Sequence, residues 1–112
     1  MAFWFARGVR RGVVTTRYPK APEPVGSTFP TPPAFRPGLL TPQLAEALES
    51  ACPSRALWRE GALLLFDLGR CTTCGECARV APEAVRPSGV FELATREPSR
   101  LVKGIPIAAV RR

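Results

Sequence analysis

Four cysteines carry the most specific chemical signal in this 112-residue chain. Cys71, Cys74 and Cys77 stand in the run CTTCGECARVAP with the spacing C-x₂-C-x₂-C. This spacing is typical of iron–sulfur binding, and the bacterial run continues with a fourth cysteine directly before a proline. Here Ala81 stands before Pro82, so a cluster bound by this run needs its fourth thiolate from another part of the chain.

An internal repeat provides a candidate for that ligand. A shift of 29 residues aligns the stretch ACPSRAL with VAPEAVR, and therefore aligns Cys52 with Ala81. In two-cluster ferredoxins the fourth cysteine of each run ligates the cluster of the other run. We therefore predict one complete [4Fe–4S] site, with Cys52, Cys71, Cys74 and Cys77 as the cluster and metal ligands.

The same shift identifies a second site whose ligands are all missing. Pro42, Ala45 and Leu48 align with the three clustered cysteines, and Ala81 takes the fourth position. None of these side chains can ligate iron. We expect a short helix that carries Ala45 and Leu48 to replace the lost loop and to pack where a second cluster would lie.

Two other uses of four cysteines stay open at this point. Structural zinc also takes four thiolates, although usually from two separated C-x₂-C pairs. An even number of cysteines permits disulfides, but no secretory signal precedes them, and clustered thiols in a reducing compartment more often bind metal. The chain has no histidine. We predict no catalytic residue and expect a non-catalytic role.

The composition divides the chain into four segments. Eight of its thirteen prolines fall between Pro19 and Pro42, so about half the chain remains for a small core. A core of this size is marginal on burial alone and usually needs a metal or disulfides to stabilise it. We predict an α+β protein with a bacterial-ferredoxin-like body of two pseudo-symmetric hairpin and helix halves. The segments are a basic amphipathic helix (1–17), a proline-rich strap (18–41), the iron–sulfur domain (42–95) and a basic tail (96–112).

Local signals place the elements of the body. Thr41 and Pro42 predict the start of a helix that ends near Cys52. The stretch RALWREGALLLF predicts a hairpin that turns at Glu60-Gly61, and a short helix is expected after Cys77. A second hairpin is expected in EAVRPSGVFEL, and the tail shows no strong periodicity.

The net charge of +7 is concentrated in the two ends of the chain. Residues 1–40 and 96–112 are strongly basic, whereas the segment between them is slightly acidic. Basic ends suit anionic lipid, nucleic acid or an acidic partner subunit. No nucleic-acid recognition motif accompanies them, so we expect no nucleic-acid binding.

The N-terminal segment AFWFARGVRRGVVT separates an apolar face from an arginine face when it is drawn as a helix. This pattern indicates a helix in a membrane interface or in a groove of a larger partner. Four apolar residues of the strap, Phe29, Phe35, Leu39 and Leu40, are expected to press onto another subunit. The chain shows no signal peptide or membrane-spanning run, so we expect peripheral attachment on the cytoplasmic side of a membrane.

The body and its cysteine run resemble the bacterial two-cluster ferredoxin fold. The opening RGVVTTRYPKAPEPV, with the strap and the body that follow, resembles the ferredoxin-like electron-transfer subunit of membrane-bound [NiFe] hydrogenases and formate hydrogenlyase. That subunit is similar to the ferredoxin-like subunit of respiratory complex I. The resemblance implies a peripheral subunit, here with a single cluster, that passes electrons to or from a neighbouring iron–sulfur (small) subunit.

The resemblance assigns cluster-ligand roles to Cys52, Cys71, Cys74 and Cys77. It also puts the outer relay of the family in doubt, because the second set of ligands is missing. Two other functions remain open: a soluble single-cluster ferredoxin, and a structural subunit whose metal only stabilises the fold.

Overall fold

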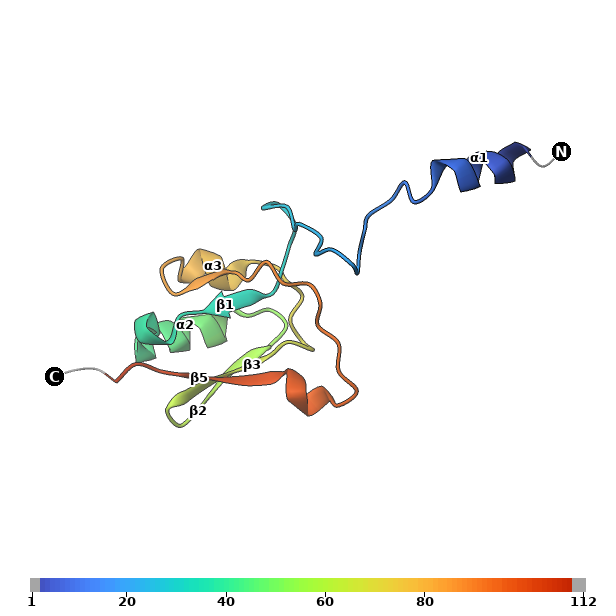
Figure 1. Cartoon of the computed structure of the whole chain (residues 1–112). Helices are drawn as coiled ribbons and strands as arrows, with labels where there is room; N and C mark the ends of the chain where they lie inside the picture. Colours follow the sequence, from blue (N-terminus) through green and yellow to red (C-terminus); the bar gives the residue numbers. More distant parts are fainter. Residues whose placement is uncertain (1–2, 110–112) are drawn as a thin grey trace.

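The computed structural model describes residues 3–109, so the outermost residues of the predicted segments 1–17 and 96–112 lie outside the described part. The body is a small mixed α+β fold with two antiparallel sheets, which confirms the predicted class. Helix α1 (Phe3–Arg11) lies apart from this body at the end of an extended arm (Figure 1). The described chain is accordingly elongated, with extents of 76 × 29 × 24 Å.

The body repeats one strand–helix–strand unit. The first unit comprises β1 (Pro33–Phe35), α2 (Pro42–Ala51) and β2 (Leu57–Glu60), and the second comprises β3 (Leu63–Asp67), α3 (Glu76–Val80) and β4 (Val85–Pro87). The two helices end 29 residues apart, at Ala51 and Val80, which is the spacing of the sequence repeat. Strand β1 pairs with β4, and β2 pairs with β3, so each sheet combines strands of both units.

The predicted second hairpin does not form. Its first strand is β4, but β4 pairs with β1, and residues 88–97, which include the expected second strand, form no strand. Two hydrogen bonds hold this segment against the strap: the Ser88 N–H donates to the Pro32 carbonyl and the Gly89 N–H donates to Thr31 Oγ1. The predicted hairpin at Glu60-Gly61 is present as β2 and β3, with a positive φ at Gly61.

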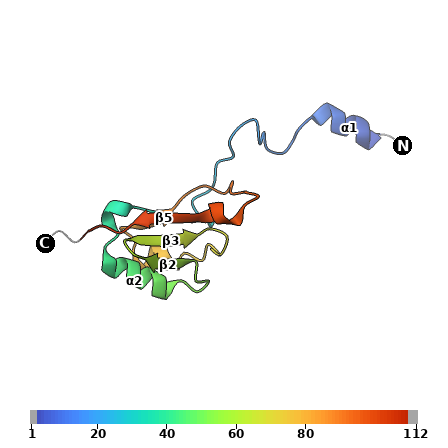
Figure 2. The ribbon, with the colours of Figure 1, turned by 90° about the horizontal axis from the view of Figure 1, so that it is seen from below.

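A strand that the sequence analysis did not predict completes the larger sheet. After a short 3₁₀ helix, η2 (Pro98–Leu101), strand β5 (Val102–Pro106) pairs with β3. Figure 2 shows these strands in the order β2–β3–β5, with α2 beside β2. Residue Ile105 of β5 is buried opposite Leu64 of β3, so part of the predicted tail belongs to the body.

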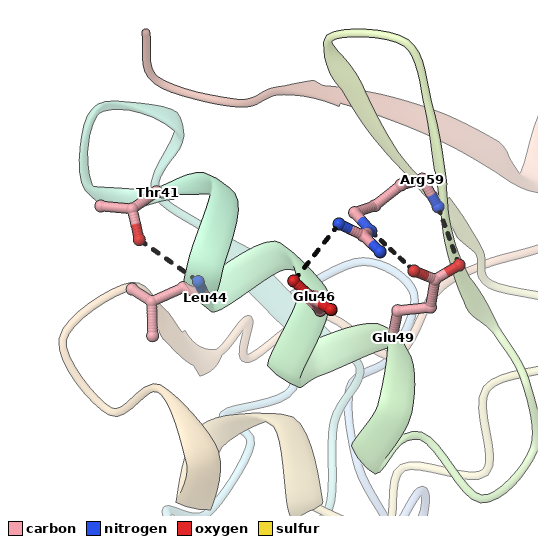
Figure 3. Close-up of polar contacts among 5 residues, drawn as sticks. All are labelled: Thr41, Leu44, Glu46, Glu49 and Arg59. Atoms are coloured by element: carbon pink, nitrogen blue, oxygen red, sulfur yellow. Dashed lines mark hydrogen bonds and ion pairs between the residues drawn. The ribbon is translucent and has the colours of Figure 1, made fainter. Parts of the chain in front are cut away.

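Helix α2 begins where the sequence predicts. The Thr41 side chain accepts a hydrogen bond from the Leu44 N–H at 3.2 Å, and Pro42 takes the first helical position (Figure 3). These are the usual features of a capped helix N-terminus. On the exposed side of α2, Glu46 and Glu49 form ion pairs with Arg59 of β2, which ties the helix to the three-stranded sheet (Figure 3).

One hydrophobic core joins the two units. Its fully buried large side chains are Leu40, Leu48 and Leu64, which come from the strap, from α2 and from β3. Phe35 of β1 packs edge-on against Phe66 of β3, with ring centroids 5.2 Å apart. The end of the strap therefore folds onto its own body, in contrast to the expectation that its apolar residues lie on another subunit.

The rest of the strap and α1 stay exposed. Before β1, most of the strap has no regular structure, and Phe29 is exposed. After β1, Leu39 is exposed in the short 3₁₀ helix η1 (Pro37–Leu39). Tyr18 contacts Phe91 with ring centroids 6.3 Å apart, and this contact attaches the start of the strap to the loop after β4. All described side chains of α1 are exposed, including Trp4 at 76%.

Candidate iron–sulfur site

All four cysteines line one pocket of the body, although Cys52 stands 19 positions before the first of the other three in the chain. Cys52 follows the last residue of α2, Cys71 and Cys74 lie in the loop between β3 and α3, and Cys77 is the second residue of α3. The crossed strand pairing brings the end of α2 to this loop. The pocket encloses a volume of about 50 Å³, which is room for a few water molecules.

Cys52 is directed into the pocket by the end of α2. The helix stops at Ala51, and Cys52 leaves it with extended backbone angles (φ −74°, ψ 110°) before Pro53. Its sulfur accepts a hydrogen bond from the Ala56 N–H at 3.3 Å and lies 3.5 Å from Ser54 Oγ. Burial raises the pKa of this thiol, but these hydrogen bonds outweigh it, so the pKa of Cys52 lies below its ordinary value.

The loop that carries the other cysteines has a constrained backbone. Thr73 has a φ of +53°, which is unusual for a β-branched residue, and its N–H donates to the Cys71 sulfur at 3.4 Å. Gly75 has a φ of +81° directly before α3. A side chain at this position would meet no other protein atom within 4 Å, so it is the backbone conformation that favours glycine here. Unusual backbone of this kind is frequent at binding sites.

The half-buried thiols of Cys71, in this loop, and Cys77, in α3, are harder to ionise. Burial is the main cause that raises the pKa of Cys71 and of Cys77, and the neighbouring cysteines raise both values further. Thiolates bind metal and protonated thiols do not, so loading such a site releases protons. Cys71 interacts electrostatically with both Cys52 and Cys74, which places thiols from the two units in one electrostatic neighbourhood.

The positions of the missing second site are filled with packed apolar side chains. Ala45, Leu48 and Ala81 are fully buried in the common core, and Pro42 begins α2. Helix α2 packs against both α3 and β2. This packing agrees with the expectation that a short helix carrying Ala45 and Leu48 replaces the lost cluster loop. Ala81 does not line the cysteine pocket.

The donor set that the pocket offers consists of four thiols. All four cysteines are free thiols, and no disulfide joins them. Within residues 3–109, no three Cys, Asp or Glu side chains are arranged to hold a single metal ion. A closed zinc site needs four ligands at about 2.0–2.3 Å from one point, whereas a cubane takes its thiolates at separate irons around a larger core. Four thiols are therefore a donor set that either centre can use, and the metal content of the protein distinguishes them.

Sequence reasoning identified the cysteines but not the rest of the pocket wall. Thr31 and Pro33 of the strap line it, as do Leu57 of β2 and Arg86 of β4. The 29-residue shift aligns Leu57 with Arg86, so the repeat that identified Cys52 also relates these two wall residues. The strap had no such signal, because its place at the pocket depends on the pairing of β1 with β4.

No protein-family model matches the chain, and no curated protein matches it significantly. Among the helices of residues 3–109, none combines the length and the apolar character that crossing a bilayer requires.

Proposed function

We propose that this chain is an electron-relay subunit with one [4Fe–4S] cluster, bound by Cys52, Cys71, Cys74 and Cys77. The observation that carries the proposal is the shared pocket, to which one unit contributes Cys52 and the other contributes the C-x₂-C-x₂-C loop. The cluster supplies one-electron exchange when it is bound. The role of the chain is to hold it, to surround it with N–H···S donors and to limit its contact with water.

The setting that we propose is a membrane-associated assembly that resembles hydrogenase or respiratory complex I. Cys74 is exposed, which leaves one side of the pocket open to a neighbouring redox subunit. That neighbour would be an iron–sulfur (small) subunit, on the cytoplasmic side of the membrane. The opposite half of the body is filled by α2 and its core contacts, so both partners of the relay would exchange electrons with the same single centre.

The metal content tests this proposal directly. Protein purified without oxygen is expected to contain about four irons and about four acid-labile sulfides per chain, where a two-cluster relative holds about eight irons. Reduction is expected to produce the EPR signal of a reduced [4Fe–4S] cluster. Zinc in place of iron would contradict the proposal, and a cluster that never changes oxidation state in the working assembly would leave only a structural role.

The exposed helix α1 supports the peripheral part of the proposal. Phe3, Trp4, Phe5 and Val9 expose their apolar side chains next to the arginines of the same helix. An isolated helix with an apolar side and a cationic side binds an anionic bilayer through both contributions. We propose that α1 lies in the headgroup region of such a bilayer.

Vesicle binding distinguishes lipid from a protein groove as the partner of α1. The combined replacement of Arg7, Arg10 and Arg11 with glutamine is expected to weaken binding to anionic vesicles on the order of 100-fold. The matched lysine variant keeps the charges and is expected to bind like the native chain. Sedimentation with vesicles measures both. If equal fractions of the native chain and the glutamine variant sediment with vesicles, the result would favour a groove in a partner subunit. If the native chain does not sediment with vesicles, the result would favour the soluble ferredoxin.

A further inference from the structure

Two charged side chains, Glu76 and Arg86, are among the described residues that line the cysteine pocket. They differ in whether a neighbour compensates their charge. Glu76 is the first residue of α3 and forms an ion pair with Arg79, with 2.6 Å between Oε2 and Nη2. Hydrogen bonding from Arg79 lowers the pKa of the Glu76 carboxyl group. This pair therefore presents little net charge to the pocket.

Arg86 has no such partner. Within residues 3–109 it forms no ion pair, and its side chain is exposed at the pocket wall. The guanidinium group of an arginine carries a full positive charge. Arg86 thus contributes an uncompensated cation at the edge of the space that the four cysteines share.

The backbone fixes the position of Arg86. It lies in the middle of β4, opposite Ala34 of β1, and its neighbour Val85 is buried in the core. The hydrogen bonds from Ser88 and Gly89 to the strap hold the end of the same strand. The cation is therefore carried by an ordered strand, and the fold fixes the point on the pocket wall from which its side chain extends.

Such a cation acts on electron uptake through its field. Four thiolate ligands make the loaded site negative, and reduction adds one more negative charge. A fixed positive charge nearby stabilises the reduced state more than the oxidised state. We propose that Arg86 is a tuning residue, whose unpaired charge at the pocket wall raises the reduction potential of the cluster. This inference rests on the proposed function, because it requires a redox centre in the pocket.

The test replaces Arg86 with glutamine in the full, cluster-loaded chain. The equilibrium constant for reduction is expected to fall about three- to tenfold, which for one electron corresponds to a potential lower by about 30–59 mV. An anaerobic redox titration followed by EPR measures it. The difference from the native chain is expected to shrink at high salt, since the charge is partly exposed.

Three further variants separate the effect of the charge from other effects. Arg86→Lys keeps the charge and is expected to keep most of the native potential. Arg96→Gln removes an equal charge from the loop after β4, away from the pocket wall, and is expected to leave the potential unchanged. Glu76→Gln frees the charge of Arg79 and is expected to shift the potential in the positive direction.

The outcomes distinguish this inference from the proposed function. Native protein without iron would overturn the proposed function. Full iron content with an unmoved potential in Arg86→Gln would overturn the inference and leave the proposed function standing. If Arg86→Gln does not retain iron, the Glu76→Gln variant decides: a positive shift supports tuning by charges at the wall, and an unmoved potential overturns it.

Discussion

Replacing Cys52 with serine is expected to reduce the iron content below four per chain and to abolish the EPR signal of the reduced cubane. The reason is geometric, because Cys52 is the only cysteine that the first unit contributes to the shared pocket. A serine hydroxyl is a poor replacement for a thiolate at an iron–sulfur centre. Electron transfer through an assembly that contains the variant is expected to stop. Iron and sulfide analysis, EPR and turnover of the assembly measure the three effects.

A double variant provides the matched control for Cys52. Cys52→Ser combined with Ala81→Cys restores the uninterrupted cysteine run of the second unit. We expect no recovery of the cubane, because Ala81 is fully buried in the core and does not line the cysteine pocket. Recovery of four irons per chain by this variant would show that the run can close its own site, and the crosswise assignment of Cys52 would then be wrong.

Replacing Leu48 with alanine is expected to destabilise the body by about 2–5 kcal/mol. Leu48 is fully buried, and it occupies a position where the repeat predicts a ligand of the missing second site. Its side chain contributes to the single core that joins α2 with the sheets. A small body has little stability to spare, so a loss of this size is a large fraction of the total. Anaerobic urea unfolding followed by far-UV circular dichroism measures it.

Leu39 provides the comparison for Leu48. It is 45% exposed in the 3₁₀ helix η1, directly before the buried Leu40. Leu39→Ala is expected to cost far less stability, because the side chain leaves little buried space behind. The Leu48→Ala variant is expected to retain its iron below the unfolding transition. Equal stability of the two variants would mean that the stability of the body does not depend on the packing of α2 in the core.

Local signals in the sequence predicted the helix start and the hairpin turn, because both features are determined by adjacent residues. Thr41 and Pro42 marked the first turn of α2, and Glu60-Gly61 marked the turn of the hairpin, because caps and tight turns depend on adjacent residues. The α+β class followed from these elements and from the repeat. The candidate site followed from the internal repeat. The 29-residue shift indicated Cys52, and the structure places Cys52 in the pocket with the other cysteines.

The errors concern pairings between distant parts of the chain. Strand β4 has hairpin signals after it, yet it pairs with β1, about 50 residues earlier, and no short pattern encodes that choice. Strand β5 contains Lys103, Gly104 and Pro106, so its sequence lacks the alternation of a half-buried strand. The segment is a strand because it pairs with β3, and its own sequence does not predict this pairing. Arg86 was missed for the same reason, since its role depends on the pocket that these pairings create.

The contact between Tyr18 and Phe91 limits how far the body can stand from whatever binds α1. Between the end of that helix and this contact lie only residues 12–17, which cover about 20 Å when fully extended. If α1 binds a surface as proposed, a tether of this length would leave the body free to turn but would confine it to a narrow zone above that surface. A redox neighbour on the same surface would then meet the pocket repeatedly at a high effective concentration, without a new search through solution.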